Sequence, residues 1–186
     1  INITAVTETG VIRAAQTLTQ LAEGYEGTPA LEALTMTDWP AFKLRGYMHD
    51  VGRSFIEFET LKKHIDLLAR FKVNTFHWHF TENHAWRFEV ECYPQLTSTE
   101  SMTRFAGKYY TQAECREVAQ YAHERGVTII PEIDMPGHMV AALASYPELG
   151  CTKGPYEVRT RWGISNDVLC AGRESTFEGV EGVLSE

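Results

Sequence analysis

The feature that most constrains the fold of this chain is an alternation of short apolar runs with longer amphipathic ones. Residues 43–51, 73–80 and 127–134 form the short runs, whereas residues 59–71 and the stretch after Thr111 carry apolar side chains at helical spacing. Strands that are apolar on both sides must be covered on both sides. Strands and helices in this order therefore predict an α/β fold with a parallel sheet covered on both faces.

The two predicted helices carry recognisable end signals. Residues 59–71 place apolar side chains along one stripe from Leu61 to Phe71, which is typical of an amphipathic helix. Thr111 and Glu114 form a Thr-x-x-Glu capping box, in which each side chain satisfies a free backbone N–H of the other residue. Gly126 then suits the left-handed residue that often ends a helix.

The beginning of the chain does not show this alternation of predicted strands and helices. Residues 1–9 alternate apolar and polar side chains like a half-buried strand. Residues 10–22 carry apolar side chains at helical spacing, and a turn-rich stretch with glycine and proline follows at residues 24–29.

The sequence "TDWPAF" suggests a joint between two units, with a domain boundary near Asp38. Because 38 residues are too few to bury a core, we interpret residues 1–38 as the end of a domain that begins earlier. Residues 39–186 form the second unit and hold all three predicted parallel strands.

Composition excludes several classes of partner. The chain of 186 residues has 17 Lys and Arg against 25 Asp and Glu, a net charge of −8. No basic run is present that would neutralise phosphates, so we expect neither a nucleic-acid partner nor an anionic membrane surface. No apolar run is long enough to span a bilayer.

The four cysteines show no Cys-x-x-Cys spacing, which argues against a zinc cluster. Cys115 falls on the apolar face of a predicted helix and is expected in the core. Cys151 and Cys170 flank a loop-like stretch. They are either a disulfide formed in an oxidising compartment or two free thiols, and the sequence leaves both alternatives open.

Titratable side chains collect where each predicted strand ends. Arg53 follows the first strand, the second ends in "HWHFTE", which includes His79 and Glu82, and the third ends in "EIDMPGH", which includes Asp134 and His138. The carboxyl ends of parallel strands meet at one edge, which is the catalytic rim of a (β/α) barrel or the ligand crevice of an open sheet. Three consecutive strands ending in this way indicate a functional site.

Each of these groups also has a plainer interpretation. His77 and His79 point to one sheet face, where they line a ligand site or form a hydrogen-bonded interior pair. Arg53 either binds a ligand or forms a surface salt bridge with Asp50 or Glu57. His84 is expected to face solvent.

The Met-Pro-Gly turn lets the Asp134 carboxylate and the His138 imidazole converge, which favours the imidazolium. The alternative is a turn-stabilising Asp134 beside an incidental histidine.

Two further interpretations come from the same residues. A His-x-His at a strand end, with a later Asp and His, is also a plausible divalent-metal constellation in a hydrolase barrel. Tryptophan rings suit the C–H face of a sugar, but isolated tryptophans usually pack in cores or loops. We therefore expect packing for each of the four, Trp39, Trp78, Trp86 and Trp162.

Several long motifs resemble glycoside hydrolase family 20, the β-N-acetylhexosaminidases: "RGYMHDVGRSF", "LLARFKVNTFHWHFTENHAWRFEVECYPQLT", "YYTQAECREVAQYAHERGVTIIPEIDMPGH" and "ALASYPELGC". The resemblance implies a partial (β/α)8 TIM-type barrel, comprising its first three β/α units, preceded by the end of a small α/β domain. The implied reaction releases terminal β-linked GlcNAc or GalNAc by substrate-assisted retention, in which the substrate's acetamido oxygen is the nucleophile. The expected partners are this carbohydrate and the remainder of the barrel, with no cofactor and no metal.

The resemblance also assigns roles. Arg53 matches the family's sugar-binding arginine. His79 is expected to contact substrate from its own position, because it lies nearer the rim than His77. Glu82, Asp134 and His138 match a supporting chain that leads to the catalytic glutamate. Here "TENHAW" stands where many members have "TDDQGW", so Glu82 keeps the carboxylate on a longer arm.

The family's His-x-Gly-Gly-Asp-Glu motif, which supplies the general acid and the acetamide-orienting aspartate, does not occur in these 186 residues. The chain ends in what looks like the helix before that strand. We therefore expect the isolated chain to be inactive, with a non-catalytic carbohydrate-binding module as the other interpretation. Family habit and the absent initiator Met suggest a periplasmic or secreted protein.

Overall fold

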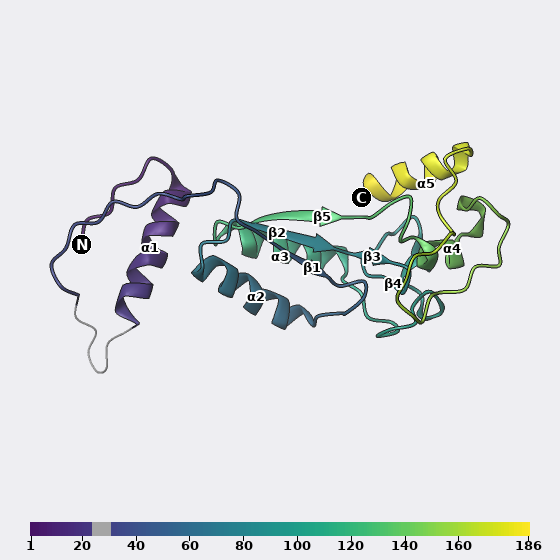
Figure 1. The fold of residues 1–186 in the computed structure, drawn as a ribbon, viewed down its shortest axis with the longest axis horizontal. Coiled ribbons are helices and arrows are strands. Elements are labelled where there is room, and N and C mark those ends of the chain that lie inside the picture. The colour runs from purple at the N-terminus through teal and green to yellow at the C-terminus, as the bar shows by residue number, and fades with distance from the viewer. Residues whose placement is uncertain (24–30) are drawn as a thin grey trace.

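A computed structural model describes residues 1–23 and 31–186 and shows an α/β chain built on a small parallel sheet (Figure 1). Its strands are β1 (Gly46–Asp50), β2 (Thr75–His79) and β5 (Thr128–Glu132), in the spatial order β1-β2-β5. Helix α2 (Phe58–Arg70) connects the first pair, and α3 (Gln112–His123) precedes β5. The predicted alternation of strand and helix is confirmed, as is the α/β class.

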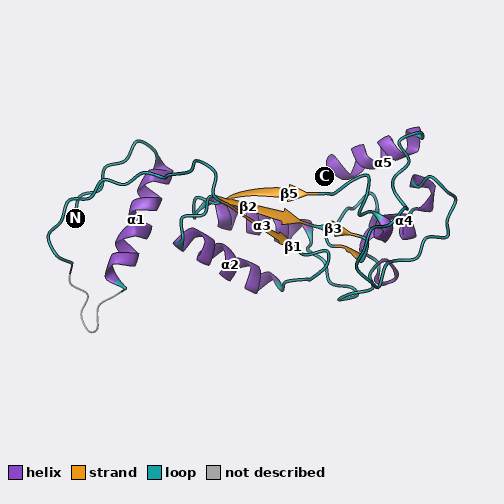
Figure 2. Cartoon of the chain, viewed as in Figure 1, coloured by secondary structure: helices purple, strands orange, loops and turns teal. Residues whose placement is uncertain are grey.

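Only one face of the sheet is covered within the described residues. Phe76 and Trp78 of β2 point toward α2 and α3 and pack with their apolar side chains in one core, and Figure 2 shows both helices on the same side of the sheet. The opposite face carries a row in which Met48, His77 and Ile130 are aligned across the three strands. Met48 is 49% exposed and Ile130 is 47% exposed. The expectation of a sheet covered on both faces is therefore wrong for the described residues, because both crossover helices pack on one side.

The predicted helix signals of α3 are confirmed. The Thr111 side chain accepts the Glu114 N–H at 3.2 Å, and the Glu114 carboxylate accepts the Thr111 N–H at 2.8 Å. Gly126 has φ +68° after the helix ends, a conformation that costs glycine nothing. Cys115 is half-buried and packs against the core, as expected.

The prediction of a strand over residues 1–9 is wrong. Helix α1 (Glu8–Ala22) begins inside that stretch because the Thr7 side chain accepts the Gly10 N–H at 3.1 Å and caps it. Residues 1–6 are exposed and pair with no strand among the described residues. The predicted turn-rich stretch at residues 24–29 lies outside the described residues, and the boundary near Asp38 remains a prediction.

A second apolar cluster lies beyond the carboxyl ends of the strands. It includes residues of strand β4 (Ala85–Trp86) and of the helices α4 (Val140–Ser145) and α5 (Glu174–Leu184). Strand β4 pairs with β3 (Thr81–Glu82) in a short antiparallel hairpin. Three short 3-10 turns complete it, at Pro94–Thr97, Thr99–Ser101 and Pro147–Leu149. The helix expected at the end of the chain is confirmed as α5.

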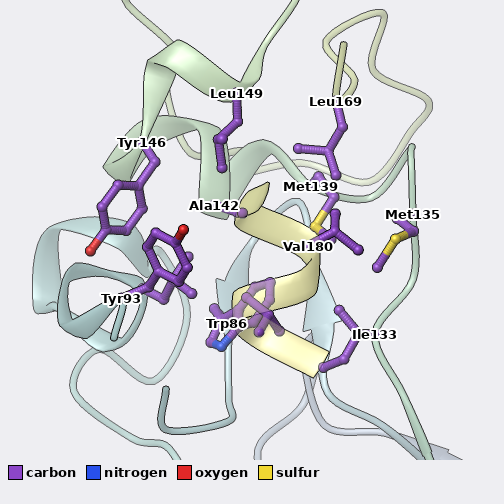
Figure 3. A pocket seen from close by; sticks show the side chains of 13 residues that line it. Trp86, Tyr93, Ile133, Met135, Met139, Ala142, Tyr146, Leu149, Leu169 and Val180 are labelled. Carbon is purple, nitrogen blue, oxygen red and sulfur yellow. The ribbon is translucent and has the colours of Figure 1, made fainter. Parts of the chain in front are cut away.

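An apolar cavity of about 30 Å³ lies inside this cluster, between Trp86, Met139 and Val180 (Figure 3). A sugar-sized ligand needs a site on the order of ten times larger. The cavity is therefore a packing gap, and the polar groups of the strand ends lie outside it.

The long segment between β4 and α3 is organised around Arg87, which is fully buried. Its guanidinium donates to the carbonyls of Phe105 at 2.9 Å and Lys108 at 2.6 Å, and its Nε donates to the Val51 carbonyl at 3.2 Å. Burial lowers the pKa of Arg87 to about 10, which leaves it charged at neutral pH. Arg87 thus fixes the loop against the end of β1.

Among the described residues, no helix is both long and apolar enough to cross a membrane.

Candidate active site

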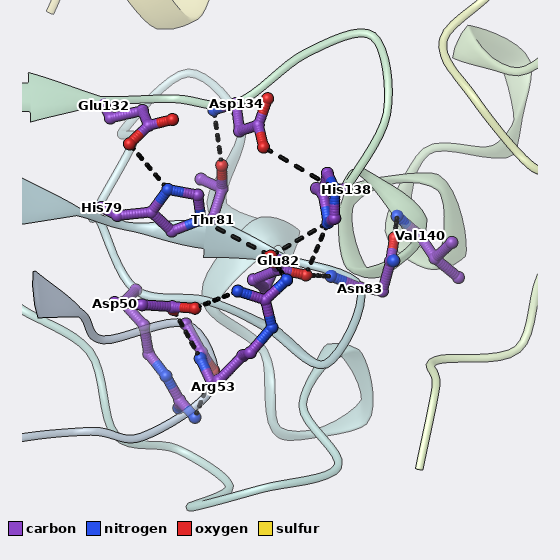
Figure 4. A network of polar contacts seen from close by, with 12 residues as sticks. Asp50, Arg53, His79, Thr81, Glu82, Asn83, Glu132, Asp134, His138 and Val140 are labelled. Atoms are coloured by element: carbon purple, nitrogen blue, oxygen red, sulfur yellow. Dashed lines mark hydrogen bonds and ion pairs between the residues drawn. The ribbon is translucent and has the colours of Figure 1, made fainter. Parts of the chain in front are cut away.

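Glu82 is the centre of a polar cluster at the carboxyl ends of the strands (Figure 4). The side chain comes from β3 and is 1% exposed. One carboxylate oxygen pairs with the Arg53 guanidinium, and His138 Nδ1 lies 2.9 Å and 3.0 Å from the two oxygens. His79 Nε2 lies 3.6 Å away, and the Asn83 N–H donates at 3.0 Å. Side chains that follow three different strands therefore meet on one carboxylate.

Parallel pairing explains why these residues meet. Asp50, His79 and Glu132 are aligned across the three strands at their last paired positions. Asp50 then accepts the Arg53 N–H at 2.9 Å and pairs with its guanidinium, which directs that side chain toward Glu82. Arg53 thus forms the salt bridge with Asp50 that the plainer interpretation expects, and it also forms a second salt bridge with the buried carboxylate of Glu82.

A glycine permits this close approach. A Cβ on Gly52 would lie 2.8 Å from Glu82 Cβ, which is closer than two carbon atoms can sit without displacement. The loop after β1 therefore comes within contact of β3 only because residue 52 has no side chain.

The cluster fixes the charge of two of its members. Burial by itself would lower the pKa of His79, but hydrogen bonds to Glu82 and Glu132 outweigh it and raise that pKa to about 9. Burial by itself would raise the pKa of Glu82, but contacts with His79, the Asn83 N–H, His138 and Arg53 lower it to about 2. At neutral pH, Glu82 is a buried carboxylate and His79 an imidazolium.

His138 reaches Glu82 from a strained turn. Its φ is +55°, a conformation that non-glycine residues adopt rarely and at a cost, often at functional sites. The Asp134 N–H donates to Thr81 Oγ1 at 3.0 Å, which holds the start of this turn against β3. The Asp134 carboxylate lies 4.0 Å from His138 Nε2. The predicted convergence is present, and the nearer carboxylate for His138 is Glu82.

Glu132 is a member of the cluster to which the sequence analysis gave no role. Its carboxylate lies 2.5 Å from His77 Nε2 and 2.7 Å from His79 Nδ1. Both histidines therefore contact a carboxylate of the neighbouring strand, as the plainer interpretation of an interior pair expects. The signal was present in the spacing, because Glu132 closes the third strand as His79 closes the second. Contact between His79 and substrate stays a prediction.

Two expectations about the loops were wrong. His84 is buried instead of solvent-facing, because residues 157–165 cross over it and the Arg161 carbonyl lies 3.2 Å from its Nε2. Trp78 and Trp86 are packed as expected, but Trp39 is 74% exposed and Trp162 is 68% exposed. Nothing in the local sequence distinguishes these two tryptophans from the buried ones.

The thiols of Cys151 and Cys170 are free in this structure but close enough to shift each other's pKa. The Cys151 pKa is raised, first by its hydrogen bond with Cys170. The Cys170 pKa is lowered, first by the Gly172 N–H and then by Cys151. The structure thus corresponds to the free-thiol alternative.

The donors of the metal alternative do come together. Asp50, His79 and Glu82 form one group, and His79, Glu132 and Asp134 another, each within 4.8 Å. His79 is common to both groups, and it must lose its proton to ligate a metal.

The class of protein follows from this arrangement. A parallel βαβαβ unit that gathers ionisable side chains at the carboxyl ends of its strands is the arrangement found at the active-site rim of (β/α) barrel enzymes. The family model described as glycosyl hydrolase family 20, catalytic domain, matches residues 42–186. This chain belongs to glycosyl hydrolase family 20.

Named relatives and solved structures agree with the family. A β-hexosaminidase of Porphyromonas gingivalis is 45% identical across 95% of this chain and 24% of its own length. The β-N-acetylhexosaminidase of Bacteroides fragilis superposes with a TM-score of 0.86 at 38% identity, over 97% of this chain and 36% of that one. A mutant Streptomyces plicatus β-hexosaminidase in complex with product GlcNAc gives 0.83 at 33% identity, over 94% and 37%. The chain thus spans 24–37% of the length of these relatives.

Proposed function

We propose that this chain is the first part of the catalytic barrel of a β-N-acetylhexosaminidase, contributing three β/α units and half of the sugar-binding rim. The observation that carries the proposal is the buried Glu82 carboxylate, on which Arg53 and His138 converge from different strand ends. The solved relative that holds GlcNAc supports an N-acetylhexosamine as the substrate. The uncovered face with Met48 and Ile130 is the surface that the remaining barrel strands would cover.

The mechanism we propose is substrate-assisted retention. The substrate's acetamido oxygen forms a bond to the anomeric carbon as the bond to the leaving oxygen breaks, and a general acid protonates that oxygen. Water then attacks the anomeric carbon as the bond to the acetamido oxygen breaks, and the proton lost by the water passes to the conjugate base of the general acid. In the family, the general acid belongs to the His-x-Gly-Gly-Asp-Glu motif, which does not occur in these 186 residues.

Within this scheme the described residues bind and position. Arg53 is a planar cation suited to the vicinal hydroxyls at the nonreducing end of the sugar. Glu82 and His138 form a hydrogen-bonded pair that positions the general acid and favours its protonated form, and Asp134 orients His138. His79 holds Glu82 in place from the barrel interior. We also propose a periplasmic or secreted location, on the grounds of family resemblance.

The test compares two lengths of chain on a chromogenic N-acetylglucosaminide. The 186-residue chain is expected to show no turnover above buffer, because it lacks the proton donor. A longer chain that includes the His-x-Gly-Gly-Asp-Glu strand and closes the barrel is expected to hydrolyse the substrate. Robust turnover by the pure 186-residue chain would show that the acid has been placed in the wrong segment.

A further inference from the structure

A loop that is remote in sequence forms part of the mouth of the cluster. Residues 157–165, which we call the rim strap, cross over the β3–β4 turn and are held by three contacts, two with the turn and one with Thr103. The Arg159 N–H donates to the Asn83 carbonyl at 3.0 Å, and the Arg159 carbonyl accepts from the Thr103 hydroxyl. The Arg161 carbonyl then lies 3.2 Å from Nε2 of the buried His84. The backbone of the strap is thus positioned immediately before Trp162.

Trp162 stands directly beside Arg53. The guanidinium carbon of Arg53 lies 5.3 Å from the centroid of the indole ring, which is cation–π distance. The centroid of the His84 ring lies 6.3 Å from that of the indole. The same guanidinium pairs with Asp50 and Glu82. Arg53 therefore links Trp162 to the centre of the site.

The exposure of Trp162 is unusual for a residue held in this way. An indole gains free energy from burying its large apolar surface, yet Trp162 is 68% exposed. Among the described residues, the Arg53 side chain forms ion pairs only with Asp50 and Glu82, so several of its five N–H groups remain for another acceptor. An exposed aromatic face next to a partly satisfied arginine matches a sugar ring, which offers C–H groups on one face and hydroxyls at its edge.

We propose that Trp162 is a substrate-binding residue whose indole stacks on the ring of the sugar that Arg53 holds by its hydroxyls. The inference rests on the proposed function and adds a contact from outside the three strand ends. The rim strap supplies that contact, and its hydrogen bonds to residues 83–103 set the height of the indole above the site. Trp162 would thus increase affinity and specificity for the sugar without taking part in proton transfer.

The experiment uses the full-length protein that contains this chain, with the substitutions Trp162→Ala and Trp162→Phe. Trp39→Ala is the matched control, because Trp39 is equally exposed but lies in the segment before β1, at the opposite end of the strands. KM and kcat are measured on a chromogenic N-acetylglucosaminide, and intrinsic fluorescence is titrated with GlcNAc.

Trp162→Ala is expected to raise KM roughly 3- to 10-fold, the range of a lost aromatic contact, with kcat within about twofold. Trp162→Phe is expected to recover most of the loss, and Trp39→Ala to leave KM unchanged. A wild-type protein that hydrolyses the substrate, with an unchanged KM in Trp162→Ala, would overturn the stacking role and leave the proposed function intact. If the wild type does not hydrolyse the substrate, the proposed function fails. In that case, quenching of the intrinsic fluorescence by GlcNAc that is lost in Trp162→Ala but kept in Trp39→Ala still supports a sugar site at Trp162. Equal quenching by GlcNAc in the wild type and in Trp162→Ala overturns the stacking role.

Discussion

At the scale of single residues, the site depends on one buried charge. Glu82 is 1% exposed and remains a carboxylate because Arg53, His79 and His138 surround it. Removing one partner of a buried ion pair leaves the other charges without compensation, which costs more than the pair itself contributes. The stability of the chain should therefore depend on pH through these residues.

The sign of that dependence follows from the two pKa values. Glu82 has a pKa of about 2 against 4.5 for the free side chain, so its contribution is present above pH 4.5 and is lost as pH falls toward 2. His79 has a pKa of about 9 against 6.5, so its contribution is present below pH 6.5 and is lost as pH rises through 9. The free energy of unfolding is expected to be greatest between pH 4.5 and 6.5.

Glu82→Gln is expected to lower the free energy of unfolding by about 3 kcal/mol at pH 6 and to flatten the acid side of the profile. Urea unfolding at a series of pH values measures both effects. Glu57→Gln is the control, because the Glu57 carboxylate pairs with Lys108 while largely exposed and should contribute at most about 1 kcal/mol. Equal losses in the two variants would contradict the central role of Glu82.

At the scale of elements, the turns after the strands decide whether the side chains meet. The loop after β1 contacts β3 at Gly52, and the loop after β5 contacts it through Asp134 and His138. These loops are short, so a small displacement of either backbone moves a charged group away from Glu82.

Two glycine substitutions distinguish the effect of the close approach between the β1 loop and β3 from the effect of changing any loop glycine near the site. Gly52→Ala is expected to destabilise the chain by about 1–3 kcal/mol, because its Cβ would lie 2.8 Å from Glu82 Cβ. Gly137→Ala lies in the adjacent loop, where an added Cβ meets nothing within 4 Å, and should be nearly neutral. Thermal unfolding of both variants checks this. A neutral Gly52→Ala would mean that the two backbones do not approach as closely as described.

At the scale of the whole molecule, the sheet has two unequal faces. One is buried by α2 and α3, and the other leaves the Met48–His77–Ile130 row in contact with water. Among the described residues, no further strand pairs with the outer edges of β1 and β5, and apolar groups on such an open sheet favour association between copies.

The 186-residue chain alone is therefore expected to bind the dye ANS and to self-associate as its concentration rises. Ile130→Lys should reduce both, because it places a charge in the middle of the open face. Leu67→Lys is the matched control, since Leu67 is 51% exposed on α2. Light scattering and ANS fluorescence measure the effects. A monomeric chain that does not bind ANS would show that this face is not available.

The sequence by itself determined the periodic features of this protein. Helices α2 and α3 and strands β1, β2 and β5 follow from side-chain spacing and from capping residues such as Thr111, which act within a few positions. Placing Arg53, Glu82 and His138 at one edge follows as well, since parallel strands bring their carboxyl ends together.

Only the tertiary structure decided which of these groups touch and what covers them. His84 is buried because Arg161, 77 positions later, crosses over it, and Trp162 meets Arg53 by the same crossing. Glu132 pairs with His77 and His79 through strand register, and one sheet face stays open because both helices pack on the other. Contacts of this kind depend on the path of long loops and on strand register, and no local pattern in the sequence encodes either.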